Sequence, residues 1–127
     1  MKDYSVMVFG KEGCDKCKIL NKRLDSLLEK PGFEKFDKTY HDITTVDGLV
    51  NFAKSEVLNP QRIPAFLVLK KSAEGKYDYI REMFEEGPDK NGKYRVPTYL
   101  GLQTDYSNGG VIRPSELKNV LNQALKA

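Results

Sequence analysis

The sequence lacks long apolar runs, and it contains only one histidine and two cysteines among 127 residues. Its longest apolar runs, such as residues 65–69, have about five residues, whereas a membrane-spanning helix needs roughly 20. We therefore expect neither a membrane-spanning segment nor a membrane partner. The first residues also lack the apolar stretch and small-residue cleavage site of a secretory signal, so we expect a cytoplasmic protein.

The charges are nearly balanced, with 21 Lys and Arg against 18 Asp and Glu and a net charge of +3. The basic residues are scattered, whereas nucleic-acid binding requires many clustered phosphate contacts, so we expect no nucleic-acid partner. An apolar content of 39%, with 7 tyrosines and 6 phenylalanines, is enough to build a core. The length predicts one domain over residues 1–127, and we expect a monomer.

The first half of the sequence has the pattern of a βαβ unit followed by a helix. Residues 4–9 are almost wholly apolar, which predicts a strand covered on both faces. A helix is expected over residues 15–30, and a strand nearer a sheet edge over residues 35–43. Thr44 or Thr45 can cap the next helix. Its expected apolar stripe consists of Val46, Leu49, Val50, Ala53 and Val57.

The second half begins with the most hydrophobic stretch, residues 63–69, which predicts a central buried strand with a proline at its start. A strand over residues 77–84, the turn-forming pair Asn91-Gly92 and a returning strand over residues 94–102 follow. The last helix is expected to begin near Pro114. The whole order predicts an α/β fold, with a central mixed sheet of four to five strands flanked by three helices.

The two cysteines form the motif Cys14-Asp15-Lys16-Cys17 at the point where the first strand gives way to the first helix. The free N–H groups and the dipole at a helix start favour a thiolate, so we expect the pKa of Cys14 to fall below about 8.5. The spacing also permits a disulfide, so Cys14 can attack a substrate disulfide and Cys17 can resolve the intermediate. A purely structural staple is a poor explanation, because so short a loop gains little closure entropy.

Two other interpretations of the motif stay open at this point. A Cys-x-x-Cys pair can ligate a metal, but the sequence has no second such pair, and only His41 could add a ligand. We therefore expect no metal site within one chain, although two chains could share an iron–sulfur cluster or metal through Cys14. The motif could also be inert, in a module that only binds a partner.

Three further segments carry a resemblance to a known family. The run Met7-Val8-Phe9-Gly10-Lys11-Glu12-Gly13-Cys14 is similar to the approach to the nucleophile in glutaredoxins. Arg62-Ile63-Pro64 resembles their Thr-Val-Pro segment, and Gly109-Gly110 precedes the last helix as their Gly-Gly pair does. With the order of elements, the chain resembles the thioredoxin fold, and more narrowly the glutaredoxins, over residues 4–70 and 109–125.

The resemblance implies a thioredoxin-like fold and a thiol–disulfide oxidoreductase that acts on protein or low-molecular-weight disulfides without a bound cofactor. Glutathione, or a disulfide reductase, would serve as electron donor, with glutathione as a co-substrate in the first case. The implied catalytic residues are Cys14 as nucleophile, Cys17 as resolving thiol and Pro64 as a cis proline. The implied substrate-binding residues are Lys11, for a glutathione carboxylate, Ile63, through its backbone, and Arg62, Gly109 and Gly110.

The chain departs from the glutaredoxin pattern at three places. Asp-Lys stands between the cysteines where glutaredoxins usually have Pro-Tyr, and Arg62 replaces a threonine. Val111 and Ile112 follow the Gly-Gly pair, where the family has an Asp or Ser for the γ-glutamyl end of glutathione. A reductase, or a dedicated protein partner, therefore remains an alternative to glutathione.

The segment over residues 72–108 is longer than the family's hairpin, so we expect an extended β-hairpin insertion there. Two roles for this insertion stay open: it binds a partner, or it is a solvated hairpin without a binding role. Its Tyr99 and Tyr106 are candidates for exposed aromatic residues, although such residues more commonly pack in the core. Val96-Pro97-Thr98 is a rival for the cis-proline position. We prefer Pro64, because its separation of 50 residues from Cys14 (64 minus 14) leaves room for one βα unit.

Overall fold

The computed structural model describes residues 2–55, 58, 62–81, 99–104, 106 and 111–127. Its elements are β1 (Tyr4–Gly10), α1 (Asp15–Leu28), β2 (Phe36–Asp42), α2 (Val46–Ser55), β3 (Ala65–Lys71), β4 (Tyr77–Tyr79), β5 (Gly101–Gln103) and α3 (Pro114–Leu125). The three predicted helices and the first three predicted strands are all present, and the last helix begins at Pro114 as expected. The predicted Asn91-Gly92 turn lies outside the described residues.

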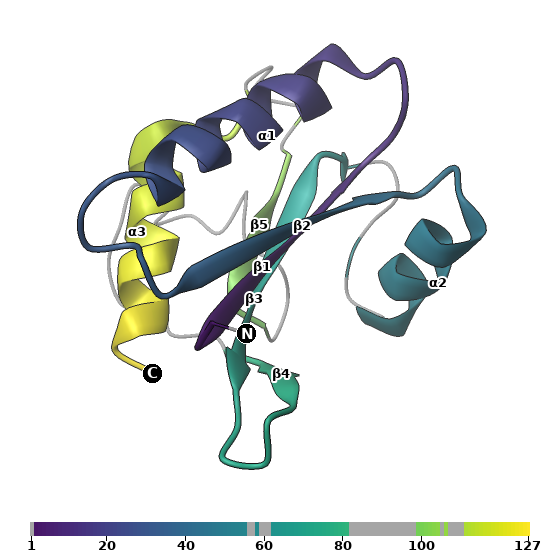
Figure 1. Cartoon of the computed structure of the whole chain (residues 1–127). Helices are drawn as coiled ribbons and strands as arrows, with labels where there is room; N and C mark the ends of the chain where they lie inside the picture. The colour runs from purple at the N-terminus through teal and green to yellow at the C-terminus, as the bar shows by residue number, and fades with distance from the viewer. Residues whose placement is uncertain (1, 56–57, 59–61, 82–98, 105, 107–110) are drawn as a thin grey trace.

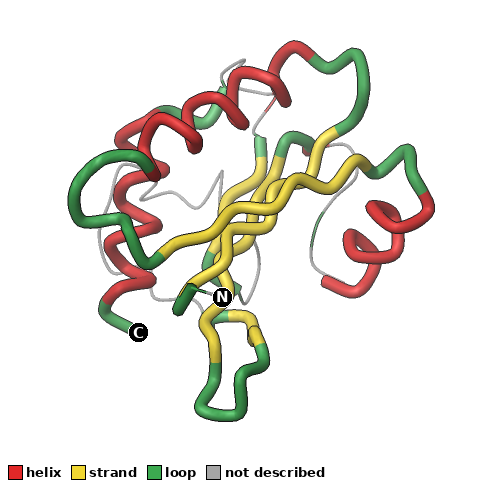
Figure 2. The backbone as a smooth tube through the Cα atoms, in the orientation of Figure 1, coloured by secondary structure: helices red, strands yellow, loops and turns green. Residues whose placement is uncertain are grey.

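The strands form one mixed, five-stranded sheet in the order β2-β1-β3-β4, with β5 also paired to β3. Figure 2 shows these strands side by side, with helices on both sides of them. β1 runs parallel to β2 and antiparallel to β3. Nearly every residue of β1 is buried, which fits its apolar run and its place inside the sheet.

β4 and β5 lie along the same edge of β3, because the other edge of β3 is paired with β1. Tyr79 of β4 pairs with Leu69, and Gly101 of β5 pairs with Leu67. The expectation that residues 94–102 return along the strand at residue 77 is met at residues 99–100, where the Leu100 N–H donates to Ile80 O at 2.8 Å, and residues 94–98 lie outside the described residues. In the described part of that segment, an isolated bridge joins Arg81 to Tyr99, and the chain then pairs with β3.

Helices cover both faces of the sheet, with α1 and α3 on one face and α2 on the other (Figure 1). Successive residues of a strand point to opposite faces, so β1 contributes Val8 to one core and Phe9 to the other. The α1 and α3 core contains the leucines that the helical spacing predicted, among them Leu20, Leu24, Leu117 and Leu121. None of the helices in the described part of the chain has the length and apolar character that a membrane-spanning helix needs.

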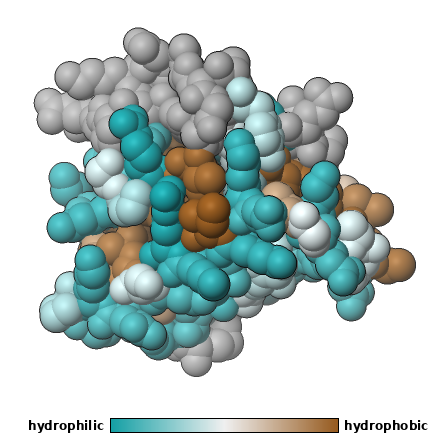
Figure 3. All heavy atoms as spheres, turned by 90° about the horizontal axis from the view of Figure 1, so that it is seen from above, coloured by the Kyte–Doolittle hydropathy of each residue, from teal (hydrophilic) through white to brown (hydrophobic). Residues whose placement is uncertain are grey.

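The predicted apolar stripe of α2 does not face the sheet over the described residues, and its last member, Val57, lies outside them. Val46, Leu49 and Val50 are exposed, and the buried face of the helix consists of Gly48, Phe52 and Ser55. In Figure 3 apolar side chains gather at the right-hand side, where α2 lies. Thr45 caps the helix as expected, accepting a hydrogen bond from the Gly48 N–H at 3.0 Å.

Gly48 is the reason for the orientation of α2. A Cβ atom at this position would overlap the backbone carbonyl of Asp42, at the end of β2. The helix therefore approaches the sheet most closely at its smallest residue, with Phe52 also packed inward, whereas Val46, Leu49 and Val50 are turned outward. Hydrophobic periodicity alone predicts that the opposite face of α2 is buried, because it does not include the steric requirement for a glycine at a close backbone contact.

Candidate active site

Cys14 is the N-cap residue of α1, which confirms the position expected from the sequence. Cys14 and Cys17 form a disulfide with a Cα–Cα distance of 5.2 Å, within the usual range for such bonds. The two cysteines differ in exposure, since Cys14 is half-buried and Cys17 is fully buried. A molecule approaching the site from solvent would therefore meet Cys14 first.

The start of α1 provides a polar contact to the sulfur of Cys14. The backbone N–H of Cys17 donates to Cys14 Sγ at 3.2 Å, in the manner of an N-cap hydrogen bond. In the reduced protein the same N–H group and the helix dipole would stabilise a thiolate at this position. The arrangement makes the more exposed sulfur, that of Cys14, the better nucleophile. The buried sulfur of Cys17 lies behind it.

Cys17 lies against the end of β1. A Cβ atom on Gly10 would be 3.0 Å from Cys17 Cβ and would overlap the hydroxyl of Tyr40. Glycine at this point lets the strand, the helix and the β2 side chain meet closely. The close contact explains why Cys17 has no exposed surface.

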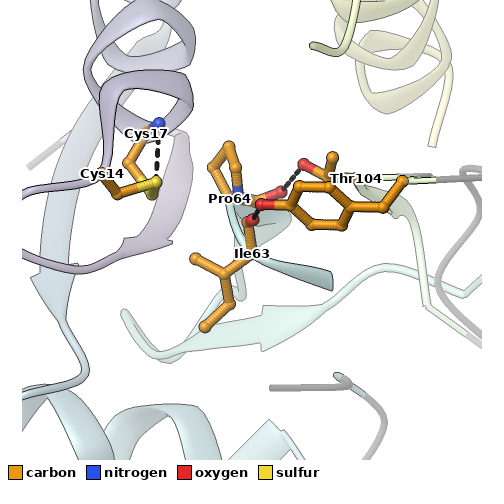
Figure 4. Close-up of a disulfide and its surroundings, with 6 residues drawn as sticks. Cys14, Cys17, Ile63, Pro64 and Thr104 are labelled. Carbon is orange, nitrogen blue, oxygen red and sulfur yellow. Dashed lines mark hydrogen bonds between the residues drawn. A yellow bond between two sulfur atoms is a disulfide. The ribbon is translucent and has the colours of Figure 1, made fainter. Parts of the chain in front are cut away.

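Ile63 and Pro64 lie beside the disulfide (Figure 4). The Ile63–Pro64 peptide bond is cis, the conformation expected for Pro64. The rival segment at Pro97 lies outside the described residues. Cys14 packs against the apolar cluster that contains Ile63, so the disulfide and this segment form one site.

Three consecutive backbone carbonyls of this segment each accept a hydrogen bond from the chain that follows β5. The N–H of Thr104 donates to Arg62 O at 3.0 Å, and its hydroxyl donates to Pro64 O at 2.6 Å. The hydroxyl of Tyr106 donates to Ile63 O. In return, Arg62 Nε donates to Thr104 O at 2.9 Å. Figure 4 shows Pro64 and Thr104 joined in this way beside the cysteines.

The sequence did not single out Thr104, and it left Tyr106 undecided between exposure and the core. Thr104 is fully buried, whereas Tyr106 is 46% exposed and lies beneath Lys16, whose Nζ is 4.8 Å from the ring centroid. Tyr99 instead stacks on Tyr79, with ring centroids 4.6 Å apart. Thr104 and Tyr106 bond to residues 40 and 43 positions earlier, so no local pattern could reveal them.

The other predicted substrate-binding residues are Lys11, Gly109 and Gly110. Lys11 is exposed in the loop between β1 and Cys14, so its short distance along the chain keeps it near the motif. Its binding of a glutathione carboxylate stays a prediction. Gly109 and Gly110 lie outside the described residues.

Among the residues that the structure describes, His41 has no group of further metal ligands beside it. Its ring stacks on Phe9 with centroids 5.3 Å apart, Nε2 lies 3.0 Å from the Thr39 hydroxyl, and burial lowers its pKa. Over the described ranges, no group of three or more His, Cys, Asp or Glu residues lies close enough together to hold a metal ion.

Replacing Thr104 with valine should lower the free energy of unfolding by about 1–2 kcal/mol. The substitution leaves the carbonyl of Pro64 without its donor in a buried setting, where an unpaired polar group is costly. Urea denaturation of Thr104→Val measures the change, and Thr104→Ser, which keeps the hydroxyl, is the matched control. Equal stability of the two variants would show that the hydroxyl does not hold this segment.

Comparisons with known proteins agree on the fold. No protein-family model matches the chain, and no curated protein matches it in sequence. Among solved structures, chloroplastic thioredoxin z is similar with a TM-score of 0.57 and 16% identity, over 99% of this chain and 81% of that one. A thioredoxin from Thermus thermophilus has a TM-score of 0.54 and 16% identity, over 97% of this chain and 74% of that one. A malarial protein has a TM-score of 0.54 and 15% identity, over 98% and 99% of the two chains.

These similarities show that the chain has a thioredoxin-like fold, as the sequence predicted. The mixed sheet of five strands and the helices on both of its faces agree with that assignment. At 15–16% identity, the matches concern the fold and not the reaction. The chemistry has to be argued from the residues at the start of α1 and from the segment around Pro64.

Proposed function

We propose that this chain is a thiol–disulfide oxidoreductase of the glutaredoxin-like type. The observation that carries the proposal is the difference between the two bonded cysteines. Cys14 is half-buried at the N-cap of α1, and Cys17 is fully buried behind it. A disulfide that served only stability would have no need of an anion-stabilising helix start on its more accessible sulfur.

The reaction uses both sulfurs in turn. The Cys14 thiolate attacks one sulfur of a substrate disulfide, the substrate S–S bond breaks, and the departing thiolate takes up a proton. The Cys17 thiol then loses its proton and attacks Cys14 Sγ, which releases the second substrate thiol. The product is the Cys14–Cys17 disulfide that the structure contains. Two electrons from glutathione, or from a dithiol of a disulfide reductase, return the pair to the reduced state.

The choice of the glutaredoxin-like type is supported by the residues that lead to Cys14 and by the segment before Pro64. Lys11 lies three positions before the nucleophile, where its ammonium can meet a carboxylate of glutathione. The Ile63–Pro64 segment lies beside the disulfide, where a substrate that reaches Cys14 would meet it. The cytoplasmic location, the monomeric state and the lack of a bound cofactor stay predictions from the sequence.

A turnover assay with two electron donors tests the proposal. The reduced protein is supplied either with glutathione, glutathione reductase and NADPH, or with thioredoxin reductase and NADPH, and it acts on a mixed glutathione disulfide or on insulin. We expect turnover of both substrates, with the faster rate on the mixed glutathione disulfide when glutathione is the donor.

The outcomes separate the two levels of the proposal. Turnover supported only by thioredoxin reductase would contradict the glutaredoxin-like type and retain the oxidoreductase. No turnover with either donor, from a protein whose thiols have been shown to be reduced, would contradict the function itself.

A further inference from the structure

Three backbone carbonyls accept hydrogen bonds from the chain after β5, and the donor on the Ile63 carbonyl is the one that a ligand can replace. The carbonyls of Arg62 and Pro64 are bonded to Thr104, which has no exposed surface. The carbonyl of Ile63 is instead bonded to the hydroxyl of Tyr106, a side chain that is 46% exposed. Solvent or another molecule can therefore compete for this position without disturbing the buried bonds on either side.

Tyr106 also connects the two halves of the site. Its hydroxyl contacts the backbone beside Pro64, and its ring lies under the ammonium of Lys16, which stands between the two cysteines. Ile63 is buried, but the Tyr106 side chain that makes both contacts is about half exposed, so a ligand that reaches it can exchange for these contacts. The ring is thus held over the site by two replaceable contacts.

A substrate that carries its disulfide on a peptide brings backbone N–H groups to this place. The cysteine sulfur is joined to the peptide backbone through a single carbon atom, so an N–H group follows the sulfur closely when it reaches Cys14. Ile63 belongs to the cluster against which Cys14 packs. Its carbonyl is therefore an acceptor that a peptide N–H would use, and the hydroxyl of Tyr106 already occupies it.

We infer that Tyr106 is a specificity-determining residue, whose hydroxyl occupies the Ile63 carbonyl in place of a substrate backbone N–H and so disfavours peptide disulfides relative to disulfides without such donors. This inference rests on the proposed function, because it concerns access to Cys14. The N–H of a peptide disulfide has to compete with the hydroxyl for the Ile63 carbonyl. A disulfide without donors reacts at Cys14 with the hydroxyl in place.

The test compares two neutral disulfides that differ in their hydrogen-bond donors. N,N′-Diacetylcystine bis(methylamide) carries peptide N–H groups on both sides of each sulfur-bearing residue, and bis(2-methoxyethyl) disulfide carries none. The pre-reduced protein is mixed with each disulfide, and the second-order rate of Cys14–Cys17 oxidation is measured by acid quenching, alkylation and mass spectrometry. The readout is the ratio of the peptide rate to the non-peptide rate.

Tyr106→Phe removes the hydroxyl and keeps the ring beneath Lys16. We expect it to raise the rate ratio about 2- to 10-fold, the range that one net hydrogen bond of ordinary strength provides. Tyr106→Leu, which removes the ring as well, should raise the ratio at least as much. Tyr99→Phe is the matched control, because its ring stacks on Tyr79 and not at the cysteines, and its ratio should equal that of the unaltered protein.

Each outcome decides the inference. An unchanged or lower ratio in Tyr106→Phe would overturn it, and so would a rise of the same size in Tyr99→Phe. If the unaltered reduced protein reacts with neither disulfide, the proposed function fails. If it reacts with both disulfides and the ratio does not respond to Tyr106, only the role of Tyr106 fails.

Discussion

Replacing Cys14 with serine is expected to abolish disulfide reduction, with a loss of about 10³-fold or more in turnover. Serine keeps the size and position of the side chain, but its hydroxyl does not ionise near neutral pH and cannot attack a disulfide. Cys17, which is fully buried, cannot substitute for it. The coupled assay with glutathione and with thioredoxin reductase measures the loss.

Replacing Cys17 with serine should stop the reaction one step later. Cys14 still attacks a protein disulfide, but no neighbouring thiol is present to resolve the product. The variant should therefore accumulate as a mixed disulfide with its substrate, detectable by mass spectrometry as an adduct that dithiothreitol removes. Each variant removes the same disulfide, so each is the control for the effect of that loss on stability.

The two variants also separate a dithiol reaction from a monothiol one. Loss of turnover in both indicates that the pair acts as a dithiol. Loss in Cys14→Ser alone, with full turnover in Cys17→Ser, indicates that glutathione resolves the intermediate. Full activity of Cys14→Ser on every substrate would contradict the assignment of the nucleophile and with it the proposed function.

The parts of the fold that the sequence predicted well are those that local patterns determine. β1 and β3 are short apolar runs that are buried in the sheet, and α1 and α3 have their leucines at helical spacing on the buried face. The position of Cys14 at the start of α1 follows from the glycine-rich break after β1. These features depend on neighbours within a few residues along the chain.

The features that the sequence did not predict depend on contacts between distant residues. α2 turns Val46 and Leu49 to solvent because Gly48 meets the carbonyl of Asp42, a steric contact that hydrophobic periodicity does not include. β5 pairs with β3, although Tyr99, two positions before it, bridges Arg81 as in the expected hairpin.

The same limit applies to the site. The cysteines and Pro64 were found because they form short motifs, whereas Thr104 and Tyr106 reach the site across 40 and 43 residues. Their bonds to Pro64 and Ile63 follow from the register of β5 on β3. That register is set by the tertiary pairing of two strands far apart in sequence.

Replacing Gly101 with alanine tests this dependence of the site on β5, and we expect it to lower the free energy of unfolding by about 2–3 kcal/mol. A Cβ atom at this buried position would overlap the carbonyl of Phe66, and it would be 2.8 Å from Leu67 Cδ2 and 3.0 Å from Leu67 Cα. Two of these three contacts are with backbone atoms of β3, which cannot rotate away. Without such contacts, alanine in a strand is favoured over glycine by roughly 0.5–1 kcal/mol, so the predicted effect has the opposite sign.

Urea denaturation measures the change, and Asp78→Ala is the control, since Asp78 is exposed on β4 along the same edge of β3. The control should change stability by no more than about 0.5 kcal/mol. A Gly101→Ala protein as stable as the original would show that a Cβ atom at this position fits between β5 and β3 without a steric clash. If β5 is displaced as expected, Thr104, three positions later, no longer donates its hydrogen bond to Pro64 O. Because this strand positions the backbone beside Cys14, the rate of disulfide reduction should fall together with the free energy of unfolding.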